Sequence, residues 1–282
     1  MNVARVVTIN LWGDHAPLEA RLDACAAGLD ALSPDVVLAQ EVRRGTGLPL
    51  TAEALAGRLG PTWHASFGAA TVGPAGTWGP GSGAGEEGLA VLSPHPVTGA
   101  HVAELPEARH LDRRVLLSAH VDVRGTPLVV HTTHLHYRLG DGPAREKQVV
   151  GVDAAARAYA AGAGGANVVQ VIGGDFNAAP ETDEIRFMVG WHTLEGRRGT
   201  WQDAFARAHP GTPGWTWASR NPSTDWLAQL WRDRRIDYLF VSPEQRGGIG
   251  RVTAARVVLD APDARGVWPS DHFGVLAEIV IG

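Results

Sequence analysis

Short apolar segments with the composition of β-strands recur along this chain, and most of them end in polar residues. The expected strands include residues 3–10, 35–40, 114–123, 128–133 and 168–173, and the stretches with helical spacing are residues 17–32 and 143–162. Strands that alternate with helices are typical of α/β domains, whereas the successive strands between residues 88 and 133 are typical of antiparallel hairpins. The pattern therefore predicts one mixed sheet or two packed sheets, with helices on the outside.

A chain of 282 residues, 44% of them hydrophobic, is long enough to bury a sizeable core. Its length lies just above the usual size of one domain, so we expect a single catalytic domain over residues 1–282. The formal net charge of -5 provides no global positive field that would attract a polyanion. Charge alone therefore does not favour nucleic acid as a partner, although a local basic groove is compatible with it.

The chain contains a single cysteine, Cys25, which excludes an intramolecular disulfide framework and a cysteine-rich zinc site. Cys25 lies on an apolar stripe with Leu22 and Leu29, and this spacing predicts a buried structural thiol. The N-terminal residues run directly into a strand-like segment, without the apolar core and cleavage site of a signal peptide. We find no apolar stretch as long as a membrane span. We therefore expect a cytoplasmic protein, and nothing in the sequence implies a protein partner.

Two stretches of unusual composition are candidates for the surroundings of a binding site. Residues 73–88 are rich in glycine but lack the Gly-Lys-Ser/Thr ending of a phosphate-binding loop. We expect them to form either a flexible surface loop or a mobile flap beside the site. Six of the ten tryptophans fall between residues 191 and 231. We expect most of these to anchor the core or loops and some, such as Trp217, to line a substrate cleft.

Polar residues at the boundaries of the expected strands are the candidates for chemistry. They are Asn10, Gln40-Glu41, Thr133-His134, Asp175 with Asn177, Asp237, and Asp271-His272. Any one of them is explained by a turn or by a structural histidine. Strand ends at one edge of a sheet can converge on one cleft, however. Turns alone hardly account for six such positions together.

The hydrolysis of a phosphoester requires residues of these types. A hard cation is needed to neutralise the phosphoryl oxygens, and the carboxylates of Glu41 and Asp271 suit Mg²⁺ or Mn²⁺. The attacking water must be oriented and deprotonated, which Asp175 can do. The sequence therefore predicts an enzyme that depends on a divalent metal.

Donors and a proton carrier complete the set. Asn10, Asn177 and His134 are candidate donors to the charge that develops around phosphorus. His272, braced by Asp237, can shuttle a proton or stabilise the pentavalent transition state. Together these residues predict a phosphoester hydrolase in which water attacks in line.

The ordered motifs resemble those of the endonuclease/exonuclease/phosphatase superfamily. They are Asn10, Gln40-Glu41, Thr133-His134-Leu135, Gly174-Asp175-Phe176-Asn177, Arg235-Ile236-Asp237-Tyr238 and Ser270-Asp271-His272. The resemblance extends over nearly the whole chain and implies a four-layer α/β/β/α sandwich of two mostly antiparallel mixed sheets with outer helices. It also implies roles: Glu41 as the principal metal ligand, Asn10 and Asp271 near the metal, Asp175 and Asn177 at the nucleophile and phosphate, Asp237 and His272 as a carboxylate-histidine pair, and His134 as a phosphate contact.

The branch of the superfamily rests on fewer residues. Asn10-Leu11-Trp12-Gly13 and Thr133-His134-Leu135-His136 are similar to neutral sphingomyelinases and related bacterial phosphodiesterases. The chain lacks the Asn-containing Gly-Leu-Arg pattern of abasic-site endonucleases, and its Gly-Asp-Phe-Asn differs from the Gly-Asp-Thr-Asn of tyrosyl-DNA phosphodiesterases. We therefore favour a phosphodiester of a small molecule or lipid headgroup as the substrate, with Arg113, His136 and Trp217 as candidate substrate-binding residues. A nuclease or nucleic-acid end-processing enzyme of the same fold is the alternative.

A zinc hydrolase is a rival interpretation, because His131, His134 and His136 lie close together in the sequence. Tyr137 follows them, however, where an enzyme of the metallo-β-lactamase type would continue with Asp-His. We therefore expect His131 and His136 to be structural or to line a pocket.

A binding module without catalytic activity is the second rival. Such a module would be expected to have lost Glu41, Asp175 or His272, and all three are present. Three residues keep two interpretations each. Arg113 and Arg114 can contact a phosphate or begin a strand in solvent, and Glu87 can face the cleft or close the glycine-rich loop.

Overall fold

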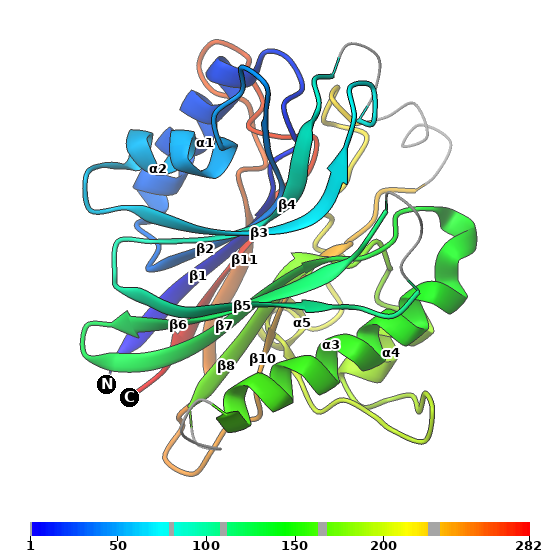
Figure 1. Ribbon diagram of the computed structural model, residues 1–282. Coiled ribbons are helices and arrows are strands. Elements are labelled where there is room, and N and C mark those ends of the chain that lie inside the picture. The colour runs from blue at the N-terminus through cyan, green and yellow to red at the C-terminus, as the bar shows by residue number, and fades with distance from the viewer. Residues whose placement is uncertain (1, 79–81, 108–111, 163–167, 225–231) are drawn as a thin grey trace.

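The computed structural model describes residues 2–78, 82–107, 112–162, 168–224 and 232–282, which form two sheets with helices around them (Figure 1). The strands are β1 (Val3–Asn10), β2 (Val36–Gly45), β3 (His64–Gly73), β4 (Gly85–Ser93), β5 (Val97–Glu104), β6 (Val115–Val123), β7 (Thr126–His134), β8 (Val169–Asp175), β9 (Gln202–Asp203), β10 (Asp237–Val241), β11 (Val252–Val258) and β12 (Gly274–Val280). The helices are α1 (Leu18–Leu32), α2 (Thr51–Leu59), the 3₁₀ helix η1 (Leu139–Asp141), α3 (Gly142–Gly162), α4 (Asp183–Met188) and α5 (Ala204–Ala208).

Each sheet has six strands and one parallel pair. The first sheet has the order β11-β12-β1-β2-β4-β3, and the second has the order β5-β6-β7-β8-β10-β9. The parallel pairs are β1 with β2 and β7 with β8, and each is joined by a crossover helix, α1 or α3. Figure 1 shows α1 and α2 outside the first sheet and α3 and α4 outside the second. The expected four-layer sandwich is confirmed.

Three layers of apolar side chains hold the sandwich together. Val36 and Leu38 of β2 lie in the core between the sheets, whereas Val37 and Ala39 face α1 and α2. Successive side chains of a strand point to opposite faces, so a strand covered on both faces is apolar throughout. This explains the uninterrupted apolar run before Gln40. A third cluster packs α3 and α4 against the second sheet.

The predicted elements agree with the structure in most places. The strand at 3–10 is β1, and the helices at 17–32 and 143–162 are α1 and α3. The predicted hairpin is formed by β6 and β7, whose connecting residues Arg124 and Gly125 have φ values of 53° and 81°. Positive φ at both residues is the geometry of a type I′ turn, which matches the twist of the two strands. In the described part of the chain, no helix has the length and apolarity to cross a membrane.

The second predicted strand was too short. β2 continues past Glu41 to Gly45, because its pairing with β4 resumes at Val42 after a bulge. Helix α2 and strand β3 were not predicted, and residues 73–88 were all expected in a loop although β4 begins at Gly85. The extent of β2 and β3 depends on their pairing with β4, which the local sequence pattern does not show. The predicted burial of Cys25 is confirmed.

Candidate active site

The strand ends singled out in the sequence meet at one edge of the sandwich. In the second sheet, His134 at the end of β7 pairs in register with Asp175 at the end of β8, and Asp175 pairs with Asp237 at the start of β10. In the first sheet, Asn10 at the end of β1 pairs with Gln40 of β2. The strand register therefore places these side chains in neighbouring rows.

Asn10 connects the two rows. Its Nδ2 donates to Glu41 Oε1 at 3.0 Å and to Asp175 Oδ2 at 3.2 Å, and its Oδ1 accepts from the backbone N–H of Trp12 at 2.9 Å. Asn10 is buried, so these hydrogen bonds satisfy its whole amide group. The residue thereby fixes the separation between a carboxylate of each sheet.

Glu41 lies in the bulge of β2, with a φ of 51°. A positive φ is uncommon for glutamate and costs on the order of 1 kcal/mol or more. Such strain persists where the surrounding structure holds it, and it is found mainly at functional sites. Here the bulge adds a residue to β2 and lets Glu41 line the cleft.

His272 lies between two carboxylates. Its Nδ1 is 3.0 Å from Asp237 Oδ2, and its Nε2 is 3.7 Å from Asp175 Oδ2. Burial opposes the charged ring, but the charges of Asp237, Asp271 and Asp175 outweigh it and raise the pKa of His272 well above its usual value. These charges therefore favour the imidazolium form of the ring.

His134 approaches Asp175 from another direction and has the opposite electrostatic character. Its Nε2 is 3.5 Å from Asp175 Oδ2. Burial, together with the charges of Arg114 and His272, lowers the pKa of His134 well below its usual value. The site therefore contains one neutral and one charged imidazole beside the same carboxylate.

Asp175 has a pKa raised to about 7, first by burial and then by the charges of Asp237 and Glu41. His272 and the backbone N–H of Asn177 oppose this increase. The carboxylate is thus suited to exchange a proton near neutral pH. Asn177, with a φ of 49°, donates its backbone N–H to Asp175 Oδ1 at 2.9 Å and its Nδ2 to the carbonyl of Leu135 at 3.2 Å.

The donor set near Glu41 fits a divalent cation. Asp271 is half-buried, and its partial removal from water and the charge of Glu41 raise its pKa to about 6. Two carboxylates that repel each other are stabilised by a cation, and oxygen donors suit Mg²⁺ or Mn²⁺. Asp175, Asp237 and His272 also place one ligand atom each within 4.8 Å of one another. That group is compatible with a metal, but a protonated His272 is a poor ligand.

The cleft beside these residues has a volume of about 570 Å³. Glu41 and His134 line it together with Trp78, Glu87, Arg114 and Tyr137. The structure decides between the two interpretations of Glu87, which lines the cleft. Glu87 lies two residues before the inward-facing Leu89 and therefore on the same face of β4. Burial and the charge of Glu41 raise the pKa of Glu87 to about 8. The period-two pattern of β4 is the signal from which the sequence could have shown this.

The three predicted substrate-binding residues lie outside the lining of this cleft among the described residues. The guanidinium of Arg113 is half exposed and pairs with Glu104 at 2.7 Å. His136 is fully buried, and Trp217 packs against Ile236. The geometry thus gives no support to substrate contact by these side chains, and Arg114 lies where Arg113 was expected.

The four described tryptophans of the tryptophan-rich stretch do not line the cleft either. Trp201 is buried in the core, whereas Trp191 and Trp215 are exposed. Trp226 and Trp231 lie outside the described residues. The tryptophan at the cleft comes instead from the glycine-rich segment, where the centre of the Trp78 ring lies 3.5 Å from the guanidinium carbon of Arg43.

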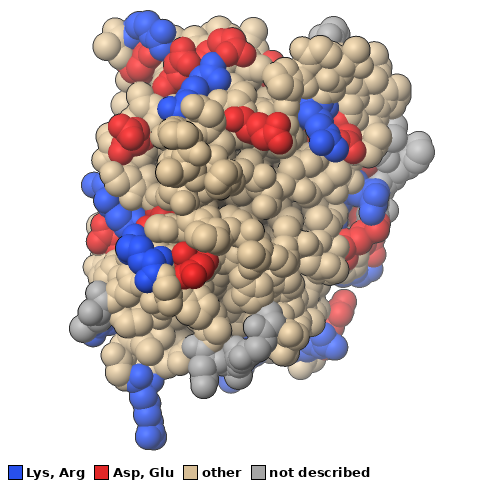
Figure 2. Space-filling model, turned by 60° about the vertical axis from the view of Figure 1, so that its left-hand side comes forward, with Lys and Arg blue, Asp and Glu red and all other residues tan. Residues whose placement is uncertain are grey.

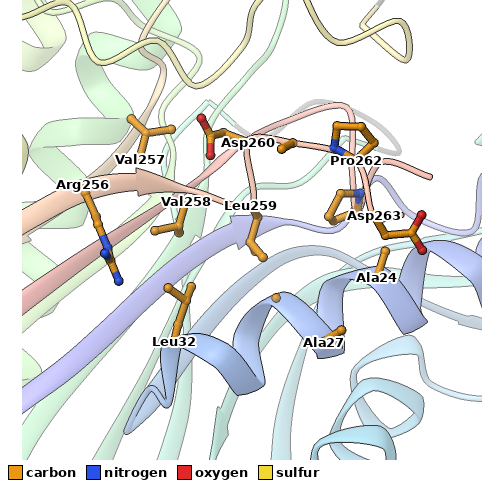
Figure 3. A pocket seen from close by; sticks show the side chains of 13 residues that line it. Ala24, Ala27, Leu32, Arg256, Val257, Val258, Leu259, Asp260, Pro262 and Asp263 are labelled. Carbon is orange, nitrogen blue, oxygen red and sulfur yellow. The ribbon is translucent and has the colours of Figure 1, made fainter. Parts of the chain in front are cut away.

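A second hollow of about 440 Å³ lies between α1 and residues 256–263 (Figure 3). Alanine and leucine side chains of α1 face Val258 and Leu259 across it. The candidate residues named above are absent from this lining. We therefore assign the chemistry to the cleft that contains Glu41 and His134.

Comparisons with known proteins agree with this geometry. A model of the Endonuclease/Exonuclease/phosphatase family matches residues 7–272. An endonuclease/exonuclease/phosphatase from Beutenbergia cavernae is 26% identical, with 100% of this chain and 72% of that chain covered and a TM-score of 0.70.

Two more distant structures share the fold. An endonuclease/exonuclease/phosphatase from Bacteroides vulgatus has 17% identity, 100% coverage of both chains and a TM-score of 0.72. D. rerio TDP2, complexed with a single-strand DNA product, has 17% identity, 99% coverage of both chains and a TM-score of 0.73. None of the curated proteins compared with the sequence matches it. The family match over nearly the whole chain shows that the protein belongs to the endonuclease/exonuclease/phosphatase family, whose members are hydrolases that act on phosphoesters and use divalent metal ions.

Proposed function

We propose that this chain is a divalent-metal-dependent phosphoester hydrolase and that residues 1–282 act as one catalytic unit. The observation that carries the proposal is the environment of Asp175. Its Oδ2 lies within 3.7 Å of nitrogen atoms of Asn10, His134 and His272. A carboxylate with a pKa of about 7, surrounded by donors and buried, is suited to hold a water and to accept its proton.

Glu41 and Asp271 would hold the metal, and Asn10 would fix the position of the Glu41 carboxylate. A bound Mg²⁺ or Mn²⁺ supplies positive charge that neutralises the phosphoryl oxygens. The mutual repulsion of the two carboxylates supports this assignment, because a cation between them removes it. The Asp237–His272 pair, which does not bind the metal in this proposal, transfers a proton or stabilises the charge of the transition state.

The remaining side chains act on the phosphoryl group. His272, kept charged by Asp237, stabilises the negative charge that develops as water attacks in line. His134 is neutral and donates a hydrogen bond to a phosphoryl oxygen. Asn177 uses one N–H of its amide for the carbonyl of Leu135, and the second is available to the substrate.

A phosphodiester of a small molecule or lipid headgroup is the substrate class that we favour. The net charge of -5 supports it, and basic and acidic side chains are interspersed on the face that Figure 2 shows. A nucleic-acid end-processing activity is the second candidate. D. rerio TDP2 shares the fold and is complexed with a single-strand DNA product, and Trp78 and Tyr137 offer aromatic rings at the cleft.

The test is a panel of phosphoesters incubated with the purified chain and Mg²⁺ or Mn²⁺. The panel contains supercoiled DNA, a single-stranded oligonucleotide, sphingomyelin, phosphoinositides and small nucleotide-like diesters. We expect hydrolysis of at least one small-molecule or lipid diester, which His272→Ala abolishes. Hydrolysis confined to DNA would favour the second candidate, and the absence of hydrolysis across the panel would contradict the proposed function.

A further inference from the structure

Arg114 is a buried arginine that lines the cleft. It directly precedes β6 and is 7% exposed, so the solvated strand entry is excluded for it. It lines the cleft together with Glu41 and His134. It also lines a smaller adjoining hollow with His134, and its positive charge contributes to the lowered pKa of that ring.

A carboxylate holds Arg114 in this position. Arg114 Nη2 pairs with Asp112 Oδ1 at 2.6 Å, and the other oxygen of Asp112 lies 3.1 Å from His136 Nδ1. Although burial opposes the charged carboxylate, the contacts with His136 and Arg114 outweigh it and lower the pKa of Asp112. Asp112 is therefore an anion that orients the guanidinium.

His136 is fixed on both sides. Its Nε2 is 3.0 Å from the carbonyl oxygen of Glu107, and its backbone N–H donates to Gln148 Oε1 at 3.2 Å. Arg145 of α3 also donates to the carbonyl of His136 at 3.1 Å. This buried histidine thus forms a rigid support for Asp112 beneath the cleft.

Arg114 has donor capacity that the protein does not use. Its Nε is buried and has no hydrogen-bond partner within the described ranges of the chain. A buried cation with unused N–H groups is stabilised by an anionic acceptor, and the planar guanidinium matches the oxygens of a phosphate. Arg113 differs in its exposure and in its partner, because its guanidinium is half exposed and paired with Glu104.

We propose that Arg114 binds a non-bridging oxygen of the substrate phosphoryl group, and that Asp112 and His136 are positioning residues that hold it there. The ligand class, a phosphate oxyanion, rests on the proposed function. The pair Arg113 and Arg114 provides a matched comparison, since the two residues are adjacent and only one lines the cleft.

The experiment measures the binding of inorganic phosphate by isothermal titration calorimetry in the presence of Mg²⁺. Arg114→Gln is expected to weaken binding about tenfold or more, the typical contribution of a charge-assisted hydrogen bond. Arg113→Gln is expected to bind like the wild type. Equal affinity of Arg114→Gln and wild type, or no measurable binding by the wild type, would overturn the proposal. If Arg114→Gln does not fold, Arg114→Lys replaces it, because lysine lacks the planar guanidinium. An unchanged phosphate affinity of Arg114→Lys would also contradict the proposal.

The positioning role is tested by a double-mutant cycle. Asp112→Asn should weaken phosphate binding when Arg114 is present and have little further effect in Arg114→Gln. Equal weakening in both backgrounds would contradict a role through Arg114. Phosphate binding is measured without turnover, so the proposed binding by Arg114 and the proposed hydrolase activity can be refuted independently. A protein that binds phosphate through Arg114 but hydrolyses no substrate would contradict only the proposed hydrolase activity.

Discussion

His272 Nδ1 lies 3.0 Å from Asp237 Oδ2, and both side chains are buried. The contact joins the loop before β12 in one sheet to the first residue of β10 in the other. It directs the second ring nitrogen toward Asp175 and keeps the ring charged. The pair is thus both a link between the two sheets and the electrostatic centre of the site.

Asp237→Asn tests this pairing. The amide removes a negative charge beside His272, so the pKa of the ring should fall and less of it is charged at neutral pH. We expect kcat to decrease on the order of 10²-fold, the lower end of the range for such groups. Steady-state kinetics with an aryl phosphodiester measure it. Asp23→Asn is the matched control, because Asp23 forms an exposed ion pair with Arg58 on the outer helices α1 and α2. Equal rates in both variants would refute the role of Asp237.

Asp175→Asn and His272→Ala test the two groups that we place at the reaction itself. Each should lower kcat by orders of magnitude, because each removes a group whose interaction is made in the transition state. Circular dichroism and thermal melting should show that both variants keep the fold. A variant with the wild-type rate would show that its residue has been given the wrong role.

How far the sequence predicts this site differs between residues. The strand-end residues Asn10, Asp175 and Asp237 were found, because an apolar run with a polar end marks its own boundary. Glu41 was found as a residue but not as part of a bulge, since the bulge arises from pairing between β2 and β4. The local sequence of β2 contains no information on that partner.

Arg113 and Arg114 show a second limit. The residues before them in the sequence are mostly polar and those after them are apolar. The strand pattern of β6 begins only at Val115, so it does not predict which way either arginine side chain points. The buried position of Arg21 was also missed as a structural support. Arg21 makes its contacts with loops far apart in the chain, and such contacts leave no local pattern.

Arg21 of α1 is expected to be a major structural contact. It is 2% exposed and donates to backbone carbonyls that include Leu11 at 2.8 Å, His15 at 2.8 Å and Pro269 at 3.2 Å. Arg21→Ala leaves these carbonyls without their donor, and we expect a loss of about 3 kcal/mol or more in the free energy of unfolding. Urea denaturation measures it. Arg58→Ala, which removes exposed ion pairs on α2, should cost little, and an equally small loss for Arg21→Ala would be inconsistent with the structure.

The stability of the fold should depend on pH in part through His131, and the lowered pKa of His134 acts in the same direction. Burial lowers the pKa of His131 to about 3 from 6.5, so between these values the unfolded chain binds a proton that the folded chain does not. His131 therefore does not lower the free energy of unfolding above about pH 6.5. Below that pH the free energy of unfolding falls as the pH decreases, with a slope of up to about 1.4 kcal/mol per pH unit. His131→Gln should flatten this slope in urea denaturation between pH 7 and pH 5, and the exposed His64→Gln should not. An identical slope in both variants would exclude His131 as its source.

The requirement for a divalent metal is the central claim, and turnover of an aryl phosphodiester by the purified chain tests it most directly. The rate is compared with Mg²⁺ or Mn²⁺, after treatment with a chelator, and after the metal is restored. We predict that the rate falls to background with the chelator and returns with the metal, and that Glu41→Gln needs a higher metal concentration for the same recovery. Undiminished turnover in the chelated protein would contradict the account.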